Sequence, residues 1–317
     1  MRIMLRYTIR RLWQSAVTVL IVITVVFLLM RMLPVEGYFE ENYDKLEPDQ
    51  RENILRSLGL LDPWYVQLRN FYSKLLKGDL GQSIVYRPKV AITTILKSKI
   101  PFSLRFGLIA MVVSLTAGLA MGVSQARFKG RWPDRIFTGY IVFINAVPAA
   151  VYLILIQLYM SKRLKLPMLF NRQNPLSWIL PAISMSLGGI AGYAMWMRRY
   201  MVDELNKDYI RLARAKGMSG AAIMVKHVMR NAFVPMAQYL PASILFTISG
   251  SIYIESLYSI PGMGGLLVDA IGRQDNTLVQ ALVLIFSTLG IVGLFLGDIA
   301  MAIFDPRIKL ARRGGAR

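Results

Sequence analysis

The sequence predicts an all-α polytopic membrane protein with six transmembrane helices. Of its 317 residues, 55% are hydrophobic, and the mean hydropathy is +0.45. A soluble domain with an ordinary surface-to-volume ratio could not keep that much apolar surface away from water. Six apolar stretches are long enough to cross about 30 Å of hydrocarbon, and lysine and arginine gather in the segments on one side of them.

The first predicted span covers residues 16–30. Four arginines precede it, the last being Arg11, and Trp13 stands where an interfacial aromatic residue is expected. A basic start followed by an apolar run also fits a secretory signal peptide. We prefer an uncleaved span, because no small-residue cleavage signal follows and the run ends at Arg31 and a Met-Leu-Pro sequence.

Five more stretches are long enough to cross a bilayer: residues 104–124, 136–160, 178–197, 233–254 and 278–304. Three of them carry glycines four residues apart, which lets helix backbones approach closely. Prolines in or beside the spans remove backbone donors, so that a kink can form next to a cavity or gate. The residues concerned are Gly118 with Gly122, Gly188 with Gly192, Gly293 with Gly297, and Pro148, Pro181, Pro235 and Pro241.

The spans divide the chain into four segments. Residues 1–31 hold the N-terminus and the first helix, and residues 32–100 form a polar stretch whose acidic and basic charges nearly cancel. We expect that stretch to be an extracytoplasmic domain, because translocated regions escape the positive-inside rule. Residues 101–304 carry the other five helices as a core membrane domain, and residues 305–317 form a C-terminal tail.

The basic residues predict the orientation. Those on one side of a six-span protein number four before the first span, four in 127–135, eight in 198–230 and five in 307–317. This side is expected to be the cytoplasm, so both termini are predicted to be cytoplasmic. Only four basic residues of the short loops, all within 162–172, fall on the opposite side.

Several functional classes lack the residues they need. Cysteine is absent, and a single histidine, His227, excludes a two-histidine zinc motif. No Gly-x-x-x-x-Gly-Lys-Ser/Thr loop is present to hold nucleotide phosphates. A secondary transporter or channel would need mid-membrane ionisable residues or a filter, and a membrane enzyme would need a polar catalytic cluster. The sequence offers little of either, so we expect no enzyme activity, cofactor or metal in this chain.

The longest segment on the basic side, residues 198–232, is patterned. A helix is expected over 203–216, with Gly217 in the left-handed conformation that ends it and Ser219 capping a second helix that runs to 231. Residues expected on one face recur every three or four positions, at Tyr209, Leu212, Ala213 and Lys216 and at Ala221, Val225, Val228 and Met229. Such a helix-turn-helix fits a groove on a cytoplasmic partner. A solvated basic loop is the alternative, and a DNA reader does not suit a unit anchored between two spans.

Residues 208–219, Asp-Tyr-Ile-Arg-Leu-Ala-Arg-Ala-Lys-Gly-Met-Ser, resemble the coupling-helix motif of binding-protein-dependent ABC importer permeases. The form is the one typical of the dipeptide and oligopeptide branch. The general motif is Glu-Ala-Ala, three residues, Gly, then nine residues and Ile-x-Leu-Pro. Its second alanine and its glycine are present as Ala213 and Gly217, whereas Arg211 and Leu212 replace the glutamate and the first alanine, and the final four residues also differ.

Other segments are similar to the B-type subunit of the same branch, so the resemblance covers nearly the whole chain. The matching segments are 58–60 with 62–67, 78–83, 255–264 and 305–308. Residues 34–37, Pro-Val-Glu-Gly, depart from the Pro-Gly-Asp-Pro type of turn that is more usual there.

The resemblance implies a type I ABC importer permease (MetI-like) fold with an external domain between helices 1 and 2. It implies a subunit in a bacterial or archaeal plasma membrane that moves dipeptides or oligopeptides into the cytoplasm. The implied partners are a second, C-type permease, two ABC ATPase subunits that bind ATP and Mg²⁺, and an extracytoplasmic peptide-binding protein. Related permeases serve nickel chelates, glutathione or opines, so these solutes stay open as alternatives.

Site residues follow from the same resemblance. ATPase coupling is expected through Asp208, Arg211, Ala213, Lys216, Gly217, Met218, Ser219 and Ala222. Gly217 and Ser219 would set the bend of a lever, whose socket would be filled by Ala213, Met218 and Ala222. A gate or translocation pathway is expected at Asn145, Pro148, Met185, Glu255, Pro261 and Asp298. Glu255 and Asp298 lie near predicted span ends, where ion pairing or interfacial snorkelling is expected.

Overall fold

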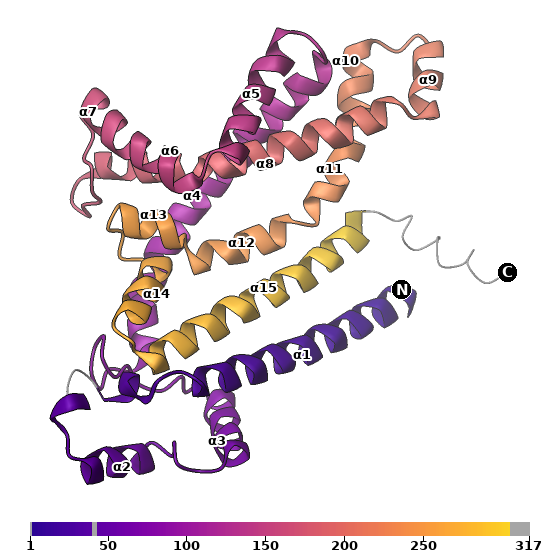
Figure 1. Cartoon of the computed structure of the whole chain (residues 1–317). Helices are drawn as coiled ribbons and strands as arrows, with labels where there is room; N and C mark the ends of the chain where they lie inside the picture. The colour runs from indigo at the N-terminus through magenta and orange to yellow at the C-terminus, as the bar shows by residue number, and fades with distance from the viewer. Residues whose placement is uncertain (1, 40–42, 305–317) are drawn as a thin grey trace.

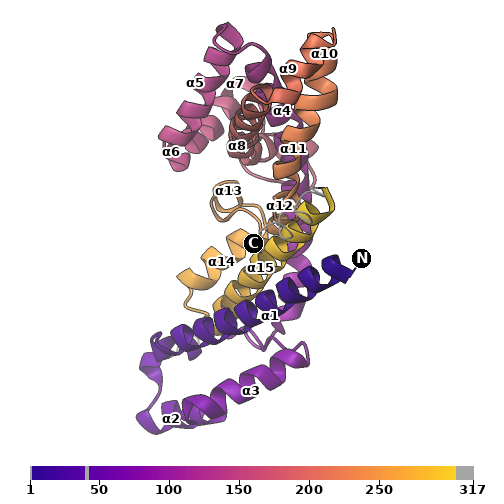
Figure 2. The same ribbon diagram turned by 90° about the vertical axis from the view of Figure 1, so that its right-hand side faces the viewer.

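The computed structural model describes residues 2–39 and 43–304, and within these ranges its regular structure is helical apart from one isolated bridge between Gln82 and Ala91. Five helices are long and apolar enough to cross a membrane, and a bent pair adds a sixth candidate. The expected all-α polytopic fold is therefore confirmed. Figures 1 and 2 show α2 and α3 at one extremity of the molecule and α9 and α10 at the other.

The helices follow in a simple order along the chain. The N-terminal part contains α1 (Arg2–Arg31), η1 (Val35–Tyr38), η2 (Tyr43–Lys45), α2 (Pro48–Ser57), α3 (Trp64–Leu76) and α4 (Ile92–Arg127). The middle contains α5 (Trp132–Ala146), α6 (Ala149–Leu155), the π-helical η3 (Ile156–Met160), α7 (Ser161–Leu164), η4 (Pro175–Trp178) and α8 (Ile179–Leu205). The remainder contains α9 (Asp208–Ala215), α10 (Gly220–Ile223), the π-helical η5 (Met224–Met229), α11 (Arg230–Ala237), α12 (Leu240–Ser249), α13 (Ile252–Leu257), α14 (Met263–Gly272) and α15 (Asn276–Phe304).

The helical bundle has two ends that differ in charge and in the elements they carry. The basic end is the one where the N-terminal part of α1, the α4–α5 turn and α9–α10 lie, and the far end is the one where α2 and α3 lie (Figure 1). Segment 305–317, which includes the expected Asp305-Pro306-Arg307-Ile308 match, falls outside the described residues.

Glycines allow α4 and α8 to pack closely. A Cβ on Gly118 would lie 2.7 Å from the Cβ of Tyr193, and one on Gly122 would lie 2.7 Å from the carbonyl oxygen of Ala194. Gly293 of α15 packs on Ala242 of α12 in the same way. These two glycine spacings therefore do bring backbones together, as the sequence predicted.

The third glycine spacing behaves differently. Gly188 and Gly192 have nothing within 4 Å of an added Cβ, and it is Gly189 that packs against Ser114 of α4. The expectation that this pair mediates packing is wrong for contacts within the chain.

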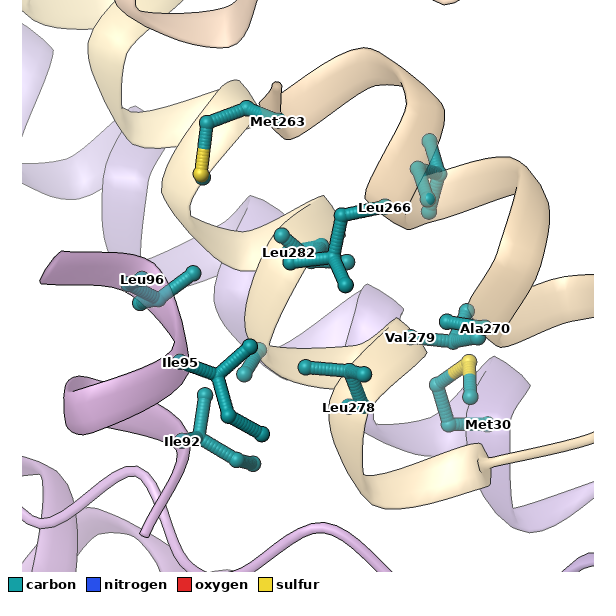
Figure 3. Packing of buried hydrophobic residues seen from close by; sticks show 12 residues of the cluster. Met30, Ile92, Ile95, Leu96, Met263, Leu266, Ala270, Leu278, Val279 and Leu282 are labelled. Atoms are coloured by element: carbon teal, nitrogen blue, oxygen red, sulfur yellow. The ribbon is translucent and has the colours of Figure 1, made fainter. Parts of the chain in front are cut away.

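A buried apolar cluster joins four helices at the far end. Figure 3 shows Ile92 and Ile95 of α4 facing Leu278 of α15, with Leu266 of α14 above them and Met30 of α1 beside them. Each is at least nine-tenths buried. Close packing of these side chains fixes how α1, α4, α14 and α15 meet.

The third predicted span, residues 136–160, is not a single helix. α5 ends at Ala146, and the chain bends by 110° before α6 begins at Ala149. Proline disfavours helical geometry in the residue before it, and Val147 adopts an extended conformation with φ −87° and ψ 130°. The predicted kink at Pro148 is confirmed, but the uninterrupted span is wrong.

The second and fifth predicted spans also differ from the structure. α4 begins at Ile92, twelve residues before the predicted start, so it includes residues that were expected to be external. The fifth span is interrupted: α12 ends at Gly250, whose φ of +70° is left-handed, and the apolar stretch that meets the length criterion is Leu240–Leu257. Glycine reaches this conformation without the steric strain of a side chain, which explains the break.

Candidate coupling surface and pathway

The segment between α8 and α11 forms a compact projection at the basic end. α8 continues to Leu205 and ends with Asn206 as its C-cap, and α9 starts at Asp208. The predicted single helix over 203–216 is therefore wrong at its beginning. Asp208 lies in the first turn of α9 and Arg214 in its last turn, where each charge suits the helix dipole.

The bend between α9 and α10 has the predicted chemistry. Gly217 has φ +76°, and the amide of Met218 donates to the carbonyl of Ala213 at 3.2 Å, which closes the end of α9. The hydroxyl of Ser219 accepts a hydrogen bond from the amide of Ala222 at 3.3 Å and caps α10. The predicted roles of Gly217 and Ser219 in the turn are confirmed.

One face of the projection is locked into the chain's own core. Ile210 and Ala213 of α9, with Ile223 and Val228 beyond the turn, pack against Met197 of α8 and other buried residues of the α4 and α11 ends. Because Ala213 is 7% exposed and lies in this cluster, its side chain faces away from the projection's surface.

The opposite face is exposed, basic and partly apolar. Leu212 and Val225, two of the periodic residues expected to share one face, are each 57% exposed. The fully exposed residues of the expected set are Asp208, Arg211, Lys216, Gly217 and Ser219, while Met218 and Ala222 are half-buried. Arg211 and Asp208 lie 3.5 Å apart as an exposed pair.

Tyr209 connects the projection to the helices on both sides of it. Its hydroxyl hydrogen-bonds to the carboxylate of Glu204 at the end of α8 and accepts from the side-chain amide of Asn231 in α11 at 2.8 Å. Its ring centroid lies 6.4 Å from that of His227. The only histidine of the sequence, His227, therefore packs beside Tyr209.

Glu255 is buried rather than interfacial. Its carboxylate accepts hydrogen bonds from the hydroxyl of Ser103 at 2.7 Å and from the amides of Gly264 and Gly265 at 2.7 and 3.1 Å, and the amide of Ser251 lies at 3.4 Å. No ion pair to it occurs among the described residues. The expected snorkelling or ion pairing of Glu255 is wrong, since its donors are backbone amides and a serine.

Asp275 is a second carboxylate that lies in a nest of converging hydrogen-bond donors, as Glu255 does, and the sequence did not reveal it. One oxygen accepts from the hydroxyl of Ser83 at 2.6 Å and from the amides of Ile84, Val85 and Tyr86 at 3.0–3.1 Å. The other accepts from the amide of Leu278 at 3.1 Å and caps the start of α15. An aspartate just before an apolar run is a helix-cap pattern that could have revealed this role.

Carboxylates at the basic end pair with arginines. Asp134 accepts two hydrogen bonds from Arg198 at 2.8 and 3.0 Å, joining α5 to α8. Asp298 lies 3.3 Å from Arg11, joining α15 to α1. The expected pairing of Asp298 is confirmed, whereas the Asp134–Arg198 pair was not foreseen.

The expected gate residues are scattered. Met185 lines a cavity of about 210 Å³ between α4, α8 and α12, together with small and hydroxyl residues such as Gly107, Ser114 and Thr247. Asn145 and Pro148 are exposed at the α5–α6 bend, and Pro261 is half-buried near Glu255. In the described ranges no group of His, Cys, Asp and Glu is suited to a metal ion.

The chain matches two families of known proteins along its length. Residues 92–310 match "Binding-protein-dependent transport system inner membrane component", and residues 4–95 match the corresponding N-terminal family. The chain belongs to the family of binding-protein-dependent transport system inner membrane components. The resemblance stated from the motif at residues 208–219 is thereby confirmed.

Curated members of this family align over almost the full length. The dipeptide transport system permease protein of Bacillus subtilis is 32% identical, covering 98% of this chain and 100% of the relative. The oligopeptide transport system permease protein of Haemophilus influenzae is 32% identical over 96% and 100%. The glutathione transport system permease protein of Escherichia coli K12 is 33% identical over 96% and 99%.

A solved structure supports the fold. It is the crystal structure of an amino acid ABC transporter with histidines, with a TM-score of 0.51 and 15% identity. The match covers 68% of this chain and 94% of that one. At this identity the likeness concerns the arrangement of helices alone.

Proposed function

We propose that this family member is one permease subunit of an ATP-driven importer that moves dipeptides or oligopeptides into the cytoplasm. The full-length relatives named for dipeptide and oligopeptide transport support the peptide class. The implied assembly contains a second permease, two ATPase subunits that bind ATP and Mg²⁺, and an extracytoplasmic peptide-binding protein. This chain contributes the path through the membrane and no ATP site.

The α9–α10 projection carries the proposal. Its inner face is buried among the ends of α4, α8 and α11, and its outer face presents exposed leucine and valine with basic residues around them. A unit with this division transmits force as a rigid body when its outer face is seated in a partner's groove. In this proposal the basic end lies in the cytoplasm, in agreement with the positive-inside rule.

Crosslinking tests the coupling surface. The chain has no cysteine, so Leu212→Cys places one thiol on the outer face of α9, and Arg56→Cys on α2 is an exposed control at the far end. We expect a short thiol crosslinker to join Leu212→Cys, and not Arg56→Cys, to an ATPase subunit of the purified complex. Equal yields at both positions, or none from Leu212→Cys, would reject the coupling surface.

Uptake assays test the transport proposal. In vesicles that contain the assembled complex, dipeptide uptake should need internal ATP and external binding protein. Uptake driven by an ion gradient, with the ATPases absent, would support a secondary transporter instead. The similarity to a glutathione permease favours one second candidate, and competition between glutathione and dipeptides for uptake separates the two.

The cavity between α4, α8 and α12 supports a location for the pathway. Its lining contains Gly, Ala, Ser, Thr, Met and aromatic residues and no charged side chain. A surface without fixed charge suits peptides whose side chains vary. Met185→Glu should lower the uptake of acidic peptides more than that of neutral ones, whereas equal loss for both would count against contact with substrate.

A further inference from the structure

Helix α3 lies against the first membrane helix, although its sequence belongs to the polar stretch between the first two spans. The ring centroids of Phe71 and Phe27 are 5.0 Å apart. The hydroxyl of Tyr72 is 2.7 Å from the hydroxyl of Thr24 and donates to the carbonyl of Leu20 at 3.1 Å. These contacts hold the C-terminal half of α3 on the side of α1.

The position of Thr24 along α1 gives the depth in the bilayer of the contacts between α3 and α1. The apolar part of α1 lies between Arg11 and Arg31, and its residues 12–30 measure about 28 Å along a helix axis, which matches roughly 30 Å of hydrocarbon. Thr24 is seven residues from Arg31, or about 10 Å along that axis. The hydroxyl of Tyr72 therefore lies within the depth of the hydrocarbon, on the far-end side of its midplane.

The surface of α3 suits the boundary between lipid and water. Trp64 and Tyr65 are exposed at its start, and Leu76 at its end is 88% exposed. Its charged residues are Arg69 and Lys74, and the helix contains no acidic residue. Aromatic residues concentrate at membrane interfaces, and basic side chains reach from there to lipid phosphates.

Its neighbour α2 provides a contrast within the same stretch. α2 carries Asp49 and Glu52 beside Arg51 and Arg56, and none of its large apolar side chains is exposed. Water is a sufficient solvent for α2. The exposed large apolar side chains of this stretch thus lie at α3, in the turn before it, and in the segment Met32–Val35 that directly follows α1.

We propose that α3 is an interfacial helix that binds the lipid surface at the far end of the bundle. Phe71, Tyr72 and Leu76 enter the acyl region, and Lys74 and Lys77 meet lipid phosphates. Lipid is the occupant because α3 continues the surface of α1, whose Ile21 and Leu28 are exposed and flank the stripe that α3 contacts. The inference is independent of the ATPase coupling and of the substrate.

Spin labels measure this depth directly, since the chain has no cysteine of its own. Leu76→Cys and Ser73→Cys place labels at exposed positions on α3, and Asn53→Cys places a matched label on α2. The assembled transporter is reconstituted in vesicles of phosphatidylethanolamine and phosphatidylglycerol. Collision rates of each label are measured with oxygen, which concentrates in lipid, and with a water-soluble nickel chelate.

The Leu76→Cys label should have an oxygen-to-nickel ratio several-fold higher than the Asn53→Cys label. Equal, water-like ratios at the two sites would overturn the proposal. Low collision rates with both reagents at Leu76→Cys would also overturn it, because a protein partner would then cover α3. Ser73→Cys keeps the test valid if the Leu76 variant assembles poorly.

Discussion

The two ends of the helical bundle hold their carboxylates differently. At the far end, Glu255 and Asp275 accept hydrogen bonds from backbone amides and serine hydroxyls, with no arginine or lysine paired to them in the described residues. At the basic end, Asp134 and Asp298 face Arg198 and Arg11. The same chemical group thus stabilises loops at one end and pairs of helices at the other.

Carboxylates bound by backbone amides and carboxylates bound by arginine side chains restrict motion of the chain differently. Backbone amides that converge on a carboxylate fix the path of the chain itself, so a nest can open only when its loop changes conformation. An arginine reaches its partner through a flexible side chain, and such a pair can lengthen or exchange partners while both helices stay intact. We therefore expect the far end to resist deformation more than the basic end.

The largest effect is expected for Glu255→Ala. It leaves two buried and two partly buried donors without their acceptor, which should lower the free energy of unfolding by about 3 kcal/mol. Thermal unfolding in detergent measures the loss. Asp269→Ala, on the exposed side of α14, is the control. Similar melting temperatures for the two variants would mean that the nest adds no stability.

Asp275→Asn tests the hydrogen bonds that the second buried carboxylate accepts. The amide can keep one oxygen for its donors but loses the negative charge that strengthens them, and we expect a loss of about 2 kcal/mol. Hydrogen exchange should accelerate at the amides of Ile84, Val85 and Tyr86. Unchanged exchange at these three amides would contradict the assignment.

Gly264→Ala tests whether the loop around Glu255 tolerates any added atom. A Cβ there would lie 2.6 Å from the amide nitrogen of Ile252, which is backbone and cannot rotate away, so a loss of about 1–2 kcal/mol is expected. Gly272→Ala, at the other end of α14, meets nothing within 4 Å. The melting temperature should fall for Gly264→Ala only, and equal shifts for the two variants would contradict a steric cause.

Arg198→Lys breaks the two-fold hydrogen bond to Asp134 while it keeps the charge. One hydrogen bond is lost, and a decrease of about 1 kcal/mol is expected in the free energy of unfolding. Chemical unfolding in detergent can resolve this. Arg199→Lys, on the exposed neighbouring position, is the control and should leave stability unchanged.

The smallest effect is expected for Asp298→Asn. Its partner Arg11 is 44% exposed, and the two charged atoms are 3.3 Å apart, so the pair contributes about 0.5 kcal/mol or less. A loss as large as that of Glu255→Ala would erase the proposed difference between the two ends.

The sequence predicted features that depend on local chemistry. Helices follow from apolar length, the turn at Gly217 from a residue that tolerates positive φ, and the break at Pro148 from the geometry that proline imposes. The family followed from a run of twelve residues around that turn. Each of these properties is contained in a few neighbouring positions.

Features that depend on distant partners could not be predicted. Glu255 is hydrogen-bonded to Ser103, 152 positions away, and Asp275 to Ser83, 192 positions away. The residues expected to share one face are divided: Leu212 and Val225 are exposed whereas Ala213 and Val228 are buried, because position relative to α8 decides which stripe is buried. Charge and periodicity alone carry no information on that position.

Helix α4 gives the two ends a mechanical connection. Ser103 on α4 donates to Glu255, and Gln125, near its other end, donates to Thr138 beside Asp134. The helical segment between these contacts is about 33 Å long, so a tilt of about 10° pivoting at Ser103 would carry Gln125 through about 6 Å. A sideways displacement of that size is enough to break the hydrogen bond between Gln125 and Thr138, so a small rotation anchored outside the basic end can change a contact there.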